Sequence, residues 1–119
     1  MADFERAKPI IINWFLQHSK KFVDDSAYEE NTPQYNETKS YEEYGIIKKD
    51  FIAVNTTVFR KMLNDNDFSP DIVIRQLIDD GFLIRDGKNL EKRIRVKGLD
   101  KLIRMTCIDK SKIEEMASE

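Results

Sequence analysis

The sequence is short of cysteine and histidine, and each shortage removes a class of chemistry. Its 119 residues include one cysteine and one histidine. A single cysteine allows neither a disulfide framework nor a cysteine metal site, and Cys107 lies in an apolar alternating stretch that predicts a buried thiol. A lone histidine such as His18, on an amphipathic helix, is far more often a packing or surface residue than a ligand or a base.

Long hydrophobic runs and catalytic motifs are also missing. The longest apolar run, Pro9 to Ile12, is far short of the ~20 residues that span a bilayer, and no basic segment precedes a secretory signal. No phosphate-binding glycine loop, nucleophile with its base, or calcium-loop spacing is present. We therefore expect a cytoplasmic, non-enzymatic protein without membrane contact, metal, cofactor or small-molecule substrate.

The composition is that of one globular domain with many charges. A chain of 119 residues has the length of a single domain. Hydrophobic residues make up 40% and charged residues 35% of the chain, against about 25% charged residues in an average domain. We expect a single domain, 1–119, divided into an N-terminal helix (1–22), an acidic loop (23–44), a compact fold (45–108) and a tail (109–119).

The charges are separated along the chain, although the net charge is only −2. Between Asp24 and Asp50, eight acidic residues face three lysines, a net of −5. Between Phe82 and Met105, eight basic residues face three acids, a net of +5. Such a basic pole can attract a polyanion, although a solvated pair of strands would have the same composition.

The N-terminal part predicts one helix followed by a loop. Helical spacing from near Asp3 to Phe22 gathers Phe4, Ile11, Trp14, Phe15, His18 and Phe22. Trp14, Phe15 and Phe22 are most simply core residues, and the alternative is a surface that meets a neighbouring domain. Residues Val23 to Tyr44 are polar and acidic and show no period, so they predict an irregular connection.

Two short helices are predicted next, after two β-prone runs around Lys48-Lys49-Asp50 that predict either a small hairpin or a bent strand. Asn55-Thr56-Thr57 is a helix start signal, and the following helix has about ten residues. Ser69-Pro70 starts the second helix, and Gly81 ends it. Its predicted buried stripe consists of Ile72, Val73, Ile74, Leu77 and Ile78.

Strands are predicted after Gly81, where the helical spacing stops. Residues 82–85 form a first β-prone run, and Asp86-Gly87-Lys88, which follows, contains the Asp-Gly signal of a hairpin turn. Leu90 to Val96 alternates apolar with basic residues, and Leu102 to Ile108 forms a third run. Ser111, three residues before Glu114, has a capping-box spacing that would start a final short helix.

This order of elements predicts an α+β winged helix-turn-helix with three main helices and a three-stranded β wing. In that fold the second helix of the pair enters the major groove of DNA, and the wing lies along the backbone. The candidate DNA-binding residues are Arg75, Gln76, Lys88, Lys92, Arg93, Arg95, Lys97, Lys101 and Arg104.

The acids on the second helix weaken this interpretation. Asp71 and Asp79 share the predicted exposed face with Arg75 and Gln76, and acids repel phosphate. Winged helices also serve as protein-docking modules, so the fold alone does not decide between DNA and protein as the partner. Double-stranded DNA is the preferred partner because of the basic wing; a protein-docking module and a free-standing phage or plasmid regulator remain alternatives.

The stretch from Tyr44 to Ile108 resembles a known family. The resemblance rests on the Tyr44-Gly45 strand start, the Val58-Phe59 helix, the Leu77–Gly81 helix end and the segment DGKNLEKRIRVKG. It is similar to the C-terminal end of AAA+ replicative helicases of phages, staphylococcal cassette chromosomes and pathogenicity islands, where a winged helix follows the MCM-like motor. The resemblance implies that the AAA+ helicase domain of a longer protein is a partner and that the bound duplex is a replication origin. The Walker motifs are not in this chain.

Overall fold

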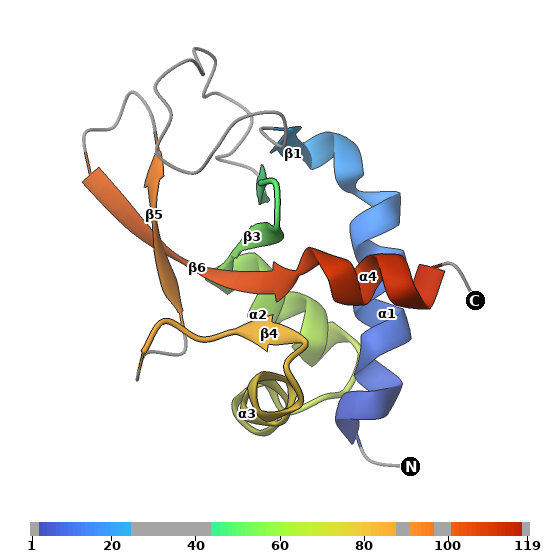
Figure 1. Ribbon diagram of the computed structural model, residues 1–119. Coiled ribbons are helices and arrows are strands. Elements are labelled where there is room, and N and C mark those ends of the chain that lie inside the picture. The colour runs from blue at the N-terminus through green and yellow to red at the C-terminus, as the bar shows by residue number, and fades with distance from the viewer. Residues whose placement is uncertain (1–2, 25–43, 88–90, 97–100, 118–119) are drawn as a thin grey trace.

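The computed structural model describes residues 3–24, 44–87, 91–96 and 101–117 (Figure 1). Its fold is α+β, a winged helix-turn-helix, which confirms the predicted class. The elements are α1 (Asp3–Gln17), a 3-10 turn (Ser19–Lys21), β1 (Phe22–Asp24), β2 (Gly45–Ile47), β3 (Phe51–Asn55), α2 (Thr56–Asp65), α3 (Pro70–Asp80), β4 (Leu83–Ile84), β5 (Lys92–Val96), β6 (Lys101–Asp109) and α4 (Lys110–Ala117).

The strands form one sheet in which β6 is central. The order is β1-β2-β3-β6-β4, and β5 also pairs with β6. The β1–β2 pair is parallel, and the other pairs are antiparallel. The end of β6 pairs with β4 (Leu83↔Ile108), whereas its beginning pairs with β5 (Val96↔Lys101). The sequence predicted a hairpin at Asp86-Gly87-Lys88, but the flanking strands β4 and β5 pair with β6, because β6 is long enough to accept both. Lys88 lies outside the described residues.

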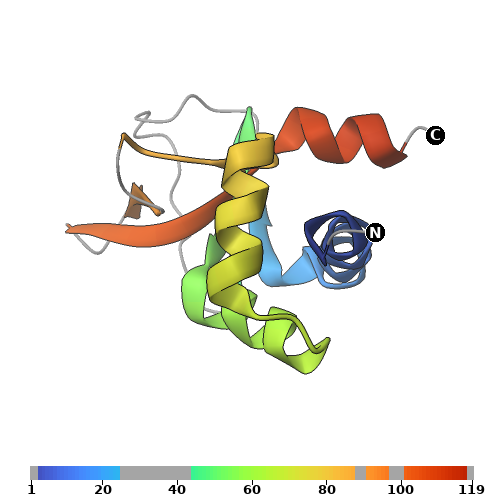
Figure 2. The same ribbon diagram turned by 90° about the horizontal axis from the view of Figure 1, so that it is seen from below.

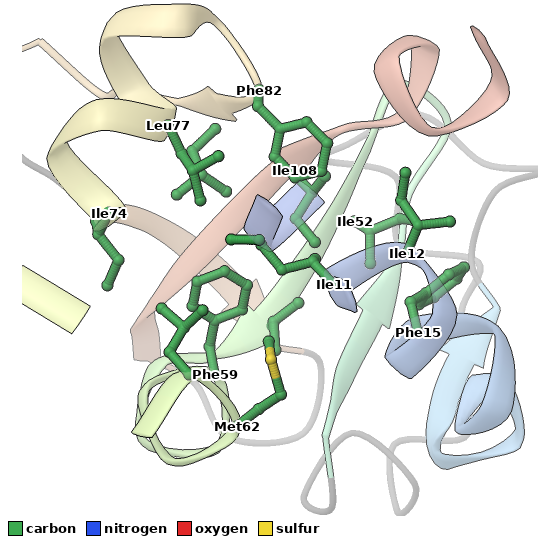
Figure 3. Close-up of a cluster of buried hydrophobic side chains, with 14 of the residues drawn as sticks. Ile11, Ile12, Phe15, Ile52, Phe59, Met62, Ile74, Leu77, Phe82 and Ile108 are labelled. Atoms are coloured by element: carbon green, nitrogen blue, oxygen red, sulfur yellow. The ribbon is translucent and has the colours of Figure 1, made fainter. Parts of the chain in front are cut away.

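The two faces of the sheet bury separate apolar clusters, as the alternation of side chains along a strand requires. On β3, Ile52 and Val54 belong to the main core with the helices, whereas Phe51 and Ala53 belong to a second cluster. Figure 3 shows the main core, in which side chains of α1, α2 and α3 meet β3 and β6. The second cluster, on the other face, consists of Ile46, Phe51, Ala53, Ile94, Met105 and Cys107. Cys107 is buried, as predicted.

The two central helices start and stop at the predicted signals. The Asn55 side chain accepts hydrogen bonds from the backbone N–H groups of Thr57 and Val58, at 3.0 and 3.3 Å, and α2 follows. Pro70 is the first residue of α3, and Gly81 ends it in the left-handed region with φ 89°. The prediction that Ile72 is buried is wrong, because its side chain is 56% exposed. At about 100° per residue, Val73, Ile74 and Leu77 define the buried face, and Ile72 lies almost opposite.

The N-terminal helix is shorter than predicted and joins the core. It ends at Gln17, not Phe22, because Phe22 instead starts β1 and pairs with Gly45 in β2. Ala7, Ile11, Ile12 and Phe15 are buried in the main core. The indole of Trp14 stacks on Tyr44 with ring centroids 5.5 Å apart and 15° between the planes. The predicted loop began at Val23, but β1 extends to Asp24; residues 25–43 lie outside the described residues.

The C-terminal helix exists, but the predicted cap is wrong. Asp109, not Ser111, caps α4: its Oδ1 accepts from the backbone N–H of Ser111 at 2.9 Å and from the Ser111 hydroxyl at 2.7 Å. The helix begins directly where β6 ends, and Ile113 docks it onto the main core. Among the described helices, none has the length and apolar composition needed to cross a membrane.

Candidate nucleic-acid interface

Helix α3 is the exposed helix of the helix-turn-helix pair. Figure 2 shows it in front of the sheet, with no other helix or strand drawn over it. Because Val73, Ile74 and Leu77 pack inward, the outer face carries Asp71, Ile72, Arg75 and Asp79, all exposed. Arg75 is therefore a cation at the middle of the exposed face of α3.

The two predicted base-reading residues differ in their surroundings. Arg75 is exposed, whereas Gln76 is half-buried, and its side-chain oxygen is buried without a hydrogen-bond partner among the described residues. The Arg75 side chain is open to solvent. Of the two side chains, that of Arg75 is therefore the more accessible.

The acid near the start of α3 is paired with a neighbouring helix. The Oδ1 atom of Asp71 lies 2.6 Å from the Nη2 atom of Arg60 on α2. The hydrogen bond from Arg60, with its positive charge, holds the pKa of the Asp71 carboxyl below its ordinary value. The sequence suggested that Asp71 would repel phosphate, but Arg60 offsets its charge.

The remaining acids of α3 lie in its last turn. Asp80 forms an ion pair with Lys8 of α1, with Oδ2 and Nζ 2.7 Å apart, and Asp79 is exposed. Each end of α3 thus carries an acid paired with a cation of another helix, and Asp79 adds an exposed acid to the last turn, whereas Arg75 lies at the middle of the helix. A polyanion would meet the beginning of the helix more favourably than its end.

The β5–β6 ladder gathers most of the predicted basic wing residues. Arg93 is the register partner of Arg104, whose side chain is exposed, and Val96 is that of Lys101. The buried side chains of Ile94 and Met105 fix this ladder to the second cluster. The ladder carries five of the candidates, Lys92, Arg93, Arg95, Lys101 and Arg104; Lys88 and Lys97 lie outside the described residues.

A hydroxyl network ties the base of this ladder to the start of α2. The Thr56 hydroxyl donates to the Oε2 atom of Glu91 at 2.5 Å and lies 3.0 Å from the hydroxyl of Thr106. Glu91 immediately precedes β5, Thr106 is buried in β6, and Thr56 is the first residue of α2. The carboxylate therefore lies at the positive end of the α2 dipole, and the network links the ladder to the helix pair.

Comparison with known proteins identifies the family. A family model described as the Cch helix turn helix domain matches residues 3–112. The chain belongs to this family. No curated protein and no solved structure matches the chain. Membership in this helix-turn-helix family supports DNA as a partner, and domains of this kind are typically non-enzymatic.

The family match includes α1, which agrees with the packing of this helix in the main core. Arg60 and Glu91 were not among the residues that the sequence singled out. Their partners, Asp71 and Thr56, are 11 and 35 residues away. No local motif connects residues at these separations, so the contacts appear only in the folded chain.

His18 and Cys107, which the sequence analysis assigned to packing, lie among other side chains of the fold. The Nδ1 atom of His18 lies 2.8 Å from the backbone oxygen of Trp14, and its ring contacts the rings of both Trp14 and Tyr44. The thiol of Cys107 lies 3.9 Å from the backbone oxygen of Met105. Within the ranges that the structure describes, no three His, Cys, Asp or Glu residues are grouped as a metal site requires.

Proposed function

We propose that this domain binds duplex DNA with the N-terminal half of α3 in the major groove and the β5–β6 ladder along the phosphates. The observation that carries the proposal is the register of β5 with β6, which places Lys92, Arg93, Arg95, Lys101 and Arg104 on one two-stranded ladder. By the alternation along the strands, Arg93, Arg95 and Arg104 share the face opposite the buried Ile94 and Met105. Phosphate contact requires long cationic residues gathered in this way. The exposed Arg75 then supplies a donor for base edges.

A salt titration of duplex binding tests the proposal. Replacing Arg93, Arg95 and Arg104 with Ala should weaken binding to unrelated duplexes alike and flatten the log–log salt slope by about two to three units. The matched control replaces three exposed cations outside the ladder, Arg6, Lys20 and Lys49. The control should leave the slope unchanged. If the ladder variant keeps both the affinity and the slope of the parent, the ladder is not the DNA surface, and protein docking becomes the better explanation.

We further propose that the domain holds origin DNA for an AAA+ helicase in the same polypeptide. The support is the resemblance of Tyr44 to Ile108 to the end of mobile-element replicative helicases, together with the helix-turn-helix family match. In a longer protein that carries this domain, the ladder variant should lose stimulation of ATP hydrolysis by origin duplex and keep its basal ATP hydrolysis. Unchanged stimulation would argue against this context and leave the DNA-binding proposal intact.

A further inference from the structure

One large apolar side chain lies on the outer face of α3. Among the described residues, the exposed large hydrophobic side chains are Leu16 and Ile72, at 54% and 56%. Single exposed apolar residues are common on protein surfaces and need no explanation by themselves. The place of Ile72 matters here, because it is the third residue of α3, and the first residues of a recognition helix contact base edges.

The outer face of α3 places a cation near Ile72. Arg75 follows three residues later on the same face, a spacing that puts Cβ atoms about 5–6 Å apart. Asp71, the preceding residue, is paired with Arg60 of α2. The first six residues of α3 therefore include an apolar group and a cation on one exposed face. Because base pairs stack about 3.4 Å apart, these two side chains can reach neighbouring base pairs.

The chemistry of the major groove decides what fits an isoleucine. Thymine exposes a C5-methyl group there, and guanine exposes two acceptors that suit an arginine. The amino groups of adenine and cytosine would lose water against Ile72 without gaining a partner, which is unfavourable. We propose that Ile72 selects a thymine methyl beside the base pair read by Arg75. This inference rests on the proposed function.

Removal of a single methyl group tests the contact. The preferred duplex is first selected from a randomised library with the full chain. Each thymine is then replaced in turn by deoxyuridine, which differs only by that methyl, and Kd is measured by fluorescence anisotropy at fixed salt. One replacement should weaken binding of the parent by about fourfold. The same replacement should have no effect on Ile72→Ala, because the variant has already lost the apolar partner.

Leu16→Ala on α1 is the matched control, because it truncates the other exposed large hydrophobic side chain. It should keep the full response to deoxyuridine. The Tm of both variants should equal that of the parent, since neither side chain is in the core. An equal deoxyuridine effect in the parent and in Ile72→Ala would overturn the inference, as would a selected site without thymine. Binding without any sequence preference would overturn it too and leave duplex binding standing, whereas no binding at low salt would remove the proposed function as well.

Discussion

Arg60 on α2 and Asp71 on α3 form an ion pair across the helix-turn-helix, with Nη2 and Oδ1 2.6 Å apart. Both side chains are exposed, so the pair contributes little to the stability of the fold. Its effect is electrostatic: it offsets a negative charge at the beginning of the proposed recognition helix. The pair therefore bears more on the binding of a polyanion than on folding.

Arg60→Ala should weaken duplex binding by more than the loss of one cation explains, because it also exposes the charge of Asp71. The matched control is Lys61→Ala on the same helix, whose lysine pairs with Asp65 and does not contact Asp71. Both variants lose one positive charge. Adding Asp71→Asn should restore much of the affinity of Arg60→Ala. Equal losses in Arg60→Ala and Lys61→Ala, measured by anisotropy at one salt concentration, would show that the ion pair has no part in binding.

The pKa of Asp71 should be measurably low. The hydrogen bond and charge of Arg60 lower it from the ordinary 3.8, so the ionised carboxylate favours the folded state. This contribution is complete above 3.8 and disappears as the pH falls through the lower folded pKa. An NMR titration of the side-chain carboxyl should show the shift, and Arg60→Gln should abolish most of it. A titration that Arg60→Gln leaves unchanged would contradict this cause.

The signals that predicted the helix pair are local. Asn55 caps α2 through hydrogen bonds to Thr57 and Val58, two and three residues later, and Gly81 ends α3 with the positive φ that glycine tolerates. Each signal acts within one turn of the chain, so a single sequence reveals it. For the same reason the order of the elements, and with it the fold class, could be predicted.

The features that the sequence did not reveal depend on distant pairing. Asp86-Gly87 has the local chemistry of a hairpin, but β6 accepts both flanking strands. Phe22 pairs with Gly45 across a segment without any period. The stripe of α3 was assigned by counting apolar residues, and the packing of three of them inward left Ile72 outside. The sequence therefore identified the charged residues of the candidate site. It did not reveal their contacts, such as the Arg60–Asp71 ion pair.

Gly45→Ala should destabilise the fold strongly. A Cβ atom at this position would lie 2.0 Å from the backbone oxygen of Ala53, so the β2–β3 pair would have to move. Overpacking of this kind costs about 1–3 kcal/mol or more of the free energy of unfolding. The control, Gly87→Ala, has the backbone strain of a positive φ but open space around the new Cβ. Denaturant titrations should rank Gly45→Ala as the less stable variant, and the opposite ranking would contradict the described strand pairing.

Arg75 should determine specificity more than affinity. If its guanidinium contacts a base edge, Arg75→Ala should cost roughly 1–3 kcal/mol of binding free energy on the preferred duplex and little on an unrelated one. Arg75→Lys keeps the charge but loses the planar fork that binds guanine with two hydrogen bonds, so it should lose discrimination while keeping non-specific affinity. The control is Arg85→Ala, which removes an exposed arginine that follows β4 and should lower binding to the two duplexes by the same factor. If Arg75→Ala also lowers binding to the two duplexes by the same factor, Arg75 contacts phosphate. Other residues of α3 would then have to read the bases.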